Sequence, residues 1–145
     1  MPAETNQAPS VDIEAVNRSL KAAVDYKDRI RAVEILGTIN SKKSKDILRN
    51  VMLHDPIHSV QNEAFLKLQA FGESVRLPKK NPKHLKSAND KIKTVQRLAD
   101  FMTDREAYLQ VFVAKYPKDF EVLSYEKRGK LETHIENVIR NMPKK

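Results

Sequence analysis

Two stretches of this chain repeat one another at a fixed distance along the sequence. Residues 29–40 (RIRAVEILGTIN) align with residues 61–72 (QNEAFLKLQAFG), and their apolar positions coincide at an offset of 32 residues. The coinciding pairs are Ala32 with Ala64, Val33 with Phe65, Leu36 with Leu68, and Ile39 with Phe71. Apolar residues in each stretch recur at helical spacing. A repeat of this length, built from two helices, predicts a stacked helical solenoid, because each unit must bury its apolar face against a neighbour.

The second repeat has well-marked helix ends. Asp55 stands where an N-cap belongs, and Pro56 follows at the first helical position, where a missing N–H has no cost. Gly72 stands where a C′ glycine would end the helix. A further helical pattern precedes each repeat, so residues 10–72 are expected to fold as two helical hairpins.

The repeat also has a recognisable residue pattern. In the second unit the pattern consists of Asp55, Pro56, Val60, Gln61, Ala64, Leu68 and Gly72, and in the first unit of Arg29, Ala32, Leu36 and Gly37. Over roughly residues 11–72 the chain resembles the short HEAT-like repeat proteins of bacteria and their phages. Gln61 stands where that family has Arg, a departure that bears on the Asp–Arg pairs between its units. The resemblance implies an α-α superhelix, a right-handed stack of helical pairs that presents a binding surface and has no catalytic residue.

The sequence changes character beyond the second repeat. Pro78 and Pro82 each remove a backbone donor and restrict the preceding residue, so residues 73–87 are expected to form a basic connector without regular helix. Three helical patterns follow in residues 88–145, and Pro117 lies at the end of the second. We expect this C-terminal three-helix extension to complete the same domain by covering the last apolar face of the solenoid.

The composition agrees with an all-α fold. Glycine is scarce, at 3 residues, and charged residues make up 32% of the chain, with many Lys, Glu, Leu and Ala. Apolar residues make up 40%, which is enough for a buried core. The expected core includes Leu36, Val60, Phe65, Leu68, Leu98, Phe112 and Ile135.

Several classes of site are not expected. The chain has no cysteine, which excludes disulfides and cysteine-ligated zinc. His54 and His58 are four residues apart, but Pro56 lies between them and no third ligand is near, so no metal site is predicted. Neither a Gly-x-Ser-x-Gly motif nor a phosphate-binding glycine loop is present. We therefore expect no enzyme activity, no cofactor and no small-molecule substrate.

The predicted setting of the protein is the cytoplasm. The first nine residues are polar, and we expect them to be a disordered lead-in rather than a signal peptide. No apolar run approaches the ~20 residues that span a membrane, so no membrane partner is predicted.

Positive charge is concentrated in one segment. The net charge of the whole chain is +8, and residues 77–97 contain seven basic residues against Asp90 alone, which gives +6. The basic residues are Lys79, Lys80, Lys83, Lys86, Lys91, Lys93 and Arg97. Three interpretations are open: contact with DNA or RNA phosphates, contact with an acidic protein, and a solvated connector. No aromatic residue lies in the segment, so base stacking is not indicated.

A second surface follows from the family resemblance, in which the second helix of each pair lines the concave face. Its outward residues here are Arg31, Glu34, Thr38, Glu63 and Lys67. This set is mixed in sign, whereas a concave cradle for DNA would be uniformly positive. The first functional hypothesis is therefore a non-catalytic adaptor or scaffold that binds another protein. The alternative is a nucleic-acid-binding accessory protein that contacts phosphates through residues 77–97.

Overall fold

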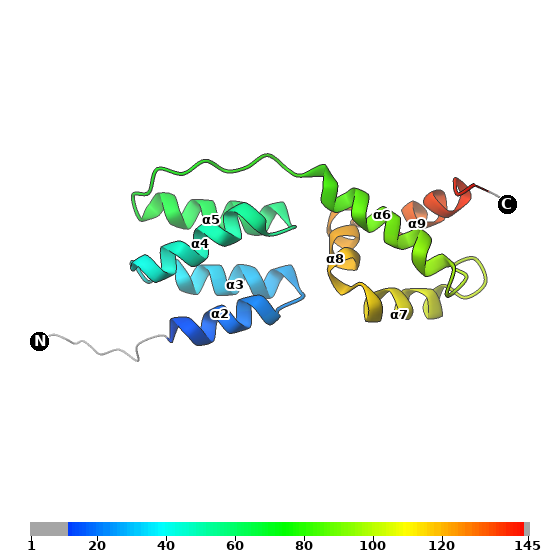
Figure 1. Cartoon of the computed structure of the whole chain (residues 1–145), viewed down its shortest axis with the longest axis horizontal. Helices are drawn as coiled ribbons and strands as arrows, with labels where there is room; N and C mark the ends of the chain where they lie inside the picture. Colours follow the sequence, from blue (N-terminus) through cyan, green and yellow to red (C-terminus); the bar gives the residue numbers. More distant parts are fainter. Residues whose placement is uncertain (1–11, 144–145) are drawn as a thin grey trace, which may run out of the picture. The chain divides into compact units, whose positions relative to one another are not determined.

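The structure, a computed structural model that describes residues 12–143, confirms the all-α class. Eight α-helices and no β-strand are found in that range (Figure 1). The helices are α2 Ile13–Ala22, α3 Tyr26–Leu36, α4 Lys42–His54, α5 His58–Ala70, α6 Pro82–Gln96, α7 Arg105–Lys115, α8 Pro117–Glu126 and α9 Leu131–Arg140. The lead-in predicted for residues 1–9 lies outside the described residues. No helix within the described range is both long enough and apolar enough to span a membrane.

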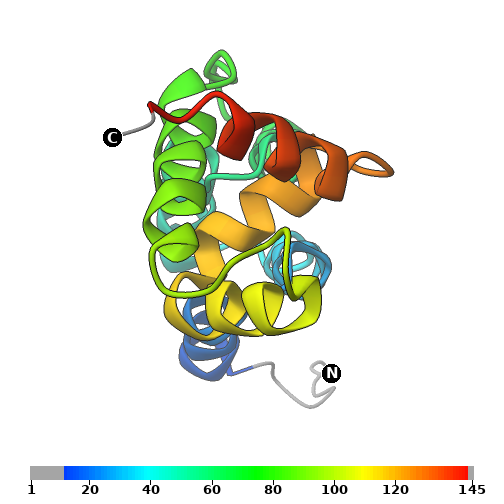
Figure 2. The same ribbon diagram turned by 90° about the vertical axis from the view of Figure 1, so that its right-hand side faces the viewer.

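The helices form two compact units, and this differs from the single continuous domain predicted from the sequence. The first unit, residues 1–78, contains α2–α5, and the second, residues 79–145, contains α6–α9. The helices of the second unit pack on one another, with α6 against each of the other three (Figures 1 and 2). They therefore have a core of their own.

The first unit consists of two helical hairpins, α2–α3 and α4–α5, as the repeat predicts. Helices α3 and α5 pack side by side, so the second helices of the two hairpins are neighbours. Leu36, Val60 and Leu68 are fully buried between them, which confirms their place in the core. Phe65 was also predicted to lie in the core, but its side chain is only half-buried.

The end of α5 has the geometry predicted for a glycine C-cap. Gly72 has a φ of +86°, in the left-handed region that favours glycine. Its amide donates to the Gln69 carbonyl at 2.9 Å, and the Glu73 amide donates to the Leu68 carbonyl at 3.0 Å. These two bonds form a Schellman motif, which satisfies carbonyls that the helix itself leaves unpaired.

The start of α5 differs from the prediction. The helix begins at His58, and the residue at its N-cap is Ile57, whose side chain makes no capping bond. Asp55 lies in the turn before it, buried, and accepts a hydrogen bond from the Ile57 amide at 2.9 Å. Asp55 is therefore not the N-cap that the sequence indicated, because its carboxylate is engaged by a residue of the other hairpin.

That partner is Arg29, at the start of α3. Its Nε and Nη2 atoms donate to the two carboxylate oxygens of Asp55 at 2.8 and 3.1 Å. Its Nη1 atom donates to the carbonyls of Ala23 and Val24 at 3.1 and 2.8 Å, in the turn between α2 and α3. The Arg29 and Asp55 side chains are only 10% and 6% exposed. One buried ion pair thus joins the two interhelical turns.

An extended segment follows α5 and lies along it. Residues 73–78 run back beside α5 in Figure 1, and His58 Nε2 is 3.4 Å from the Pro78 carbonyl oxygen. Val75 and Leu77 in this segment are half-buried. The segment therefore covers part of the α5 surface that no third hairpin covers.

The predicted connector is shorter than expected, because α6 begins at Pro82 and not after Ser87. Pro82 occupies the N1 position, and the Asn81 side chain accepts from the Lys83 amide at 2.9 Å as the N-cap. Proline is tolerated at N1, where its missing N–H would have no partner within the helix. Pro82 therefore begins a helix, although the sequence pattern predicts that it interrupts one.

The second unit has four helices and not the three predicted. Pro117 follows the end of α7, as predicted, and it also opens α8 at its N1 position, directly after Tyr116. Gly129, with a φ of +76°, lies in the break between α8 and α9. The third predicted helical pattern therefore corresponds mainly to α9, and α8, which precedes it across a left-handed glycine turn, was not predicted.

The core of the second unit is aromatic. Phe101 and Tyr108 are fully buried with their rings edge to face at 5.1 Å, and Phe112 continues the cluster at 6.1 Å from Tyr108. The Tyr108 hydroxyl donates to the Ile92 carbonyl at 2.8 Å, and burial raises the pKa of Tyr108 far above its usual range. Phe112 and Ile135 are buried as predicted.

Leu98 was predicted in the core but is 58% exposed. Helix α6 ends at Gln96, so the helical spacing that would place Leu98 on the buried face no longer applies. Phe101, further along the turn, occupies the core instead. The exposure of Met102, at 43%, has the same cause.

Replacement of Leu68 by Ala should lower the free energy of unfolding by about 2–5 kcal/mol, the range for a buried leucine. Leu66, on the same helix but 46% exposed, is the matched control, and Leu66→Ala should cost less than about 1 kcal/mol. Urea denaturation followed by circular dichroism measures both. Equal losses would contradict the burial of Leu68.

Replacement of Asp55 by Ala should cost about 3–5 kcal/mol, because it leaves the Arg29 guanidinium buried without its counter-ion. The double variant Arg29→Met, Asp55→Ala should lose less than the sum of the two single losses. The control is Arg31→Met, whose ion pair with Asp28 is exposed, and it should cost below about 1 kcal/mol. Strict additivity of the Arg29 and Asp55 losses in denaturation experiments would show that the pair does not act as a unit.

Candidate polyanion-binding face

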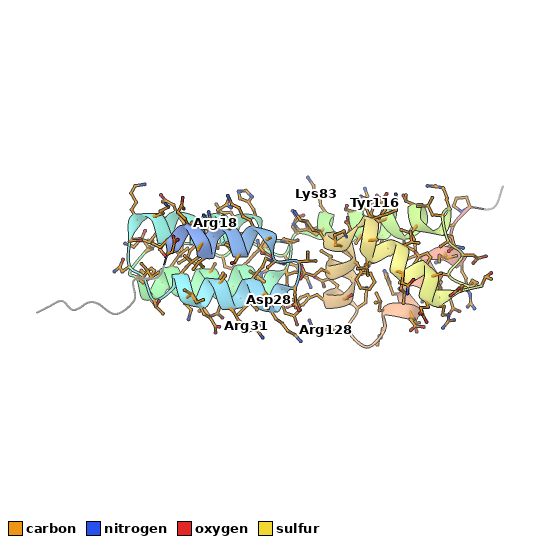
Figure 3. All side chains as sticks on the ribbon, turned by 90° about the horizontal axis from the view of Figure 1, so that it is seen from below. Arg18, Asp28, Arg31, Lys83, Tyr116 and Arg128 are labelled. Atoms are coloured by element: carbon orange, nitrogen blue, oxygen red, sulfur yellow. The ribbon has the colours of Figure 1, made fainter. Side chains whose placement is uncertain are left out.

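Three basic residues of the predicted basic segment lie along one face of α6, and Arg97, the C-cap residue of the helix, continues the same stripe. The stripe consists of Lys83, Lys86, Asp90, Lys93 and Arg97, and successive members are three or four residues apart. At 3.6 residues per turn, these five positions fall within an arc of about 80°. We call this set the α6 face. Its side chains are exposed, except Lys93, which is half-buried, and Figure 3 shows Lys83 extending away from the helix.

The opposite side of α6 anchors the helix in the second unit. Ala88, Ile92 and Val95 are fully buried there, against the helices that surround α6. Burial of this side fixes the rotation of α6 about its axis. The basic side chains are therefore held on one surface and not spread along a flexible connector, which was one of the alternatives left open by the sequence.

Three residues of the predicted set, Lys79, Lys80 and Lys91, do not belong to this face. Lys80 Nζ lies 2.5 Å from the Glu126 carboxylate, at the end of α8. Lys91 Nζ lies 4.0 Å from the Asp119 carboxylate and 5.3 Å from the centre of the Tyr116 ring. Their charges are balanced within the unit. Lys79 is exposed and precedes the helix.

The cations of the α6 face have no such partners among the residues that the structure describes: Lys83, Lys86, Lys93 and Arg97 form no ion pair there. Helix α4 provides the comparison, since it also carries four cations. Each of those is within 4 Å of a carboxylate: Lys42 of Asp46, Lys43 of Glu14, Lys45 of Glu73, and Arg49 of Asp46 and Glu73. The α6 face is therefore a local source of uncompensated positive potential.

The net charges of the two units agree with a positive potential at the α6 face. The second unit has sixteen Lys and Arg against nine Asp and Glu, a net charge of +7. The first unit has eleven against ten, a net charge of +1. Nearly all of the excess charge of the chain therefore lies in the unit that contains α6.

The predicted protein-binding face lies on α3 and α5. Arg31 and Glu34 are exposed on the side of α3 opposite its buried residues, and Thr38, which is also exposed, lies in the turn after the helix. Arg31 is paired with Asp28 at 2.5 Å, and both point away from the helix in Figure 3. The Thr38 hydroxyl donates to the Ile35 carbonyl at 2.6 Å. The Arg31 guanidinium and the Thr38 hydroxyl thus already have hydrogen-bond partners in their own segment of the chain.

The α5 part of this face is less exposed. Glu63 and Lys67 form an ion pair at 3.3 Å, and both are half-buried. The Lys67 stem crosses Gly37, where an added Cβ would lie 2.5 Å from the Lys67 Cδ atom. Gly37 therefore leaves room for this side chain between the two hairpins. The α3–α5 face is mixed in sign, as the sequence predicts.

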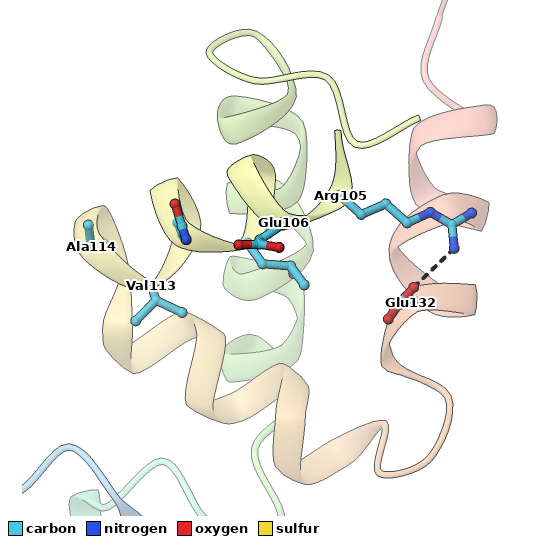
Figure 4. Close-up of a pocket in the computed structure, with 7 residues that line it drawn as sticks. Arg105, Glu106, Val113, Ala114 and Glu132 are labelled. Carbon is cyan, nitrogen blue, oxygen red and sulfur yellow. Dashed lines mark hydrogen bonds and ion pairs between the residues drawn. The ribbon is translucent and has the colours of Figure 1, made fainter. Parts of the chain in front are cut away.

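The second unit also has an open groove of about 620 Å³ beside α7. It is lined by Arg105, Glu106, Leu109, Gln110, Val113, Ala114 and Glu132 (Figure 4). Its lining is mainly apolar, and Arg105 bridges it to α9 through Glu132 at 3.0 Å. The groove contains no nucleophile paired with a base.

The histidines do not assemble a metal site. Within residues 12–143 no three histidine or carboxylate side chains are grouped as ligands of a metal ion would be. His58 contacts the Pro78 carbonyl, and His134 Nε2 lies 2.7 Å from the Asn89 Oδ1 atom. Burial, and then the charge of Lys127, lower the pKa of His134 below its usual value. This contact joins α9 to α6.

Comparison with protein-family models, with curated proteins and with solved structures gives no match for this chain. Its function is therefore argued from its own geometry.

The sequence identified the basic residues but not their grouping. The spacing of Lys83, Lys86, Asp90, Lys93 and Arg97 is visible in the sequence as a helical stripe. The sequence alone does not assign this stripe to a helix, because Pro82 is compatible both with a break between helices and with a helix start. The roles of Lys80 and Lys91 depend on α8, which the sequence analysis did not predict.

Proposed function

We propose that this protein is a non-catalytic nucleic-acid-binding protein whose second unit contacts the phosphate backbone through the α6 face. The observation that carries the proposal is the alignment of four exposed or half-exposed cations, without ion pairs among the described residues, on one rigid helix. Arg and Lys are the side chains that bind phosphate, and their charges attract a polyanion over the distance set by salt screening.

The chemistry of the α6 face favours the backbone over the bases. None of its five residues is aromatic, so it offers no platform on which a base can stack. Contacts from Lys and Arg to phosphate fix position without reading sequence. The proposed binding is therefore independent of sequence and strongly dependent on salt.

In this proposal the first unit acts as a helical-repeat scaffold. Its two stacked hairpins, with α3 beside α5 and an Asp–Arg pair between them, support the resemblance to HEAT-like repeats. We propose that the two hairpins form a short α-α superhelix of that kind, and that it presents the α3–α5 face.

The salt dependence of binding tests the α6 face. If its four cations each displace a counterion from duplex DNA, the slope of log K against log salt should be about −3 to −4. Replacement of Lys83, Lys86, Lys93 and Arg97 by Gln should abolish most of that slope and of the affinity at low salt. Fluorescence anisotropy with a labelled duplex measures both quantities.

The matched control replaces three lysines and one arginine of the first unit, namely Arg18, Lys21, Lys27 and Lys42, all of which are exposed. The net charge changes by the same amount, so an effect of overall charge would appear in both variants. A slope equally reduced in both would contradict a site on α6. Absence of binding to DNA and RNA at low salt would remove the proposal.

A second candidate function is a protein-binding adaptor that uses the α3–α5 face. The observation in its favour is the alternation of exposed charges on that face, Arg31 and Glu34 on α3, beside the Glu63–Lys67 pair on α5. A mixed-sign surface is complementary to another mixed-sign protein surface and unfavourable for a polyanion.

Charge reversal tests the adaptor. The double variant Arg31→Glu, Glu34→Lys keeps the net charge but inverts the pattern on α3, and it should lose a stoichiometric protein partner in nuclease-treated affinity purification. The control Lys42→Glu, Asp46→Lys inverts an exposed pair on α4 and should retain the partner. Loss of the partner only when the α6 cations are replaced would place the protein-binding site on the second unit.

A further inference from the structure

The α6 face is interrupted by an acidic residue at its centre. Asp90 is exposed on the same face as the four cations, and its carboxylate forms no ion pair with the residues that the structure describes. The face therefore consists of a pair of cations, Lys83 and Lys86, then Asp90, then a second pair, Lys93 and Arg97. At a rise of 1.5 Å per residue, the centres of the two pairs are about 16 Å apart along the helix axis.

This arrangement is unfavourable for one strand laid along the helix. A nucleic-acid strand carries a phosphate at every nucleotide, so a strand that follows the face from one cation pair to the other brings negative charge past Asp90. Proteins that bind single strands usually add aromatic platforms for the bases, and the α6 face has none. Both features disfavour a single-stranded ligand.

The same arrangement is favourable for a duplex groove. The major groove of B-DNA is about 12 Å wide and is bordered on its two sides by the phosphates of different strands. A helix that lies across it can place one cation pair near each strand, because Lys and Arg side chains extend several ångströms beyond the helix. The centre of the helix then faces the floor of the groove and not a phosphate.

We infer that Asp90 makes the α6 face selective for double-stranded nucleic acid, with the Lys83–Lys86 pair and the Lys93–Arg97 pair each contacting one of the two strands that border a groove. This inference rests on the proposed function and assigns the ligand class to the same face. Asp90 acts as a specificity-determining residue by repelling the phosphates of a single strand that follows the helix.

The test compares the full-length protein with its Asp90→Asn variant. Affinities are measured by fluorescence anisotropy for a labelled duplex of about 20 base pairs and for one of its strands alone, at the same ionic strength. Wild-type protein should prefer the duplex. Asp90→Asn should raise the affinity for the single strand by about three- to fivefold, the effect of one charge within about 4–6 Å in water, and change the duplex affinity by less than about twofold.

Glu106→Gln is the matched control, because it removes one exposed negative charge from α7 in the same unit. It should leave the ratio of the two affinities as in wild type. A wild-type preference for the single strand, or a ratio that Asp90→Asn and Glu106→Gln change equally, would overturn the inference while leaving nucleic-acid binding in place. Absence of binding to both probes would overturn the proposed function itself, so the two failures are distinguishable.

Discussion

The ion pair between Arg29 and Asp55 is the interaction on which the first unit depends. Removal of two charges from water is costly, and the cost is recovered only where every polar atom has a partner. Here the guanidinium donates to both carboxylate oxygens and to the Ala23 and Val24 carbonyls, and Asp55 also accepts from the Ile57 amide. The same network therefore fixes the α2–α3 turn, the α4–α5 turn and the register between the hairpins.

The pair also explains why the two repeats differ at the positions involved. At the 32-residue offset, Arg29 corresponds to Gln61, and Asp55 corresponds to Ala23. A ladder in which each arginine pairs with the aspartate of the following unit needs only one pair when there are two units. Gln61, which has no following hairpin, instead donates to the Met52 carbonyl at 2.9 Å, and residues 73–78 lie along α5 where a third hairpin would pack. Gln61 and Arg29, which occupy equivalent positions in the two hairpins, thus have different partners.

The sequence predicted those parts of the fold that depend on local spacing. The two hairpins, the Gly72 cap and the burial of Leu68 follow from helical periodicity and from the left-handed conformation that glycine adopts. The prediction from the sequence was wrong where one residue type is compatible with two different structures. Proline ends a helix or begins one, so Pro82 and Pro117 were assigned to breaks, and with them the start of α6 and the whole of α8 were missed. The cations of the candidate site could be predicted from the sequence. Which of them form ion pairs could not be predicted, because the pairs depend on tertiary contacts with α8.

Helix α6 has an apolar side whose burial stabilises the helix and an exposed side whose like charges repel one another. Like charges three or four residues apart destabilise an isolated helix by about 0.2–0.5 kcal/mol per pair, and Lys83–Lys86 and Lys93–Arg97 are two such pairs. Most helical stability in proteins comes from packing of the apolar side, and α6 buries Ala88, Ile92 and Val95 against its neighbours. Helix α6, which packs against all three of the other helices in its unit, can therefore carry repelling charges, whereas the cations of α4 are neutralised by carboxylates. A ligand that supplies negative charge at both pairs would relieve this repulsion, so binding and helix stability would increase together.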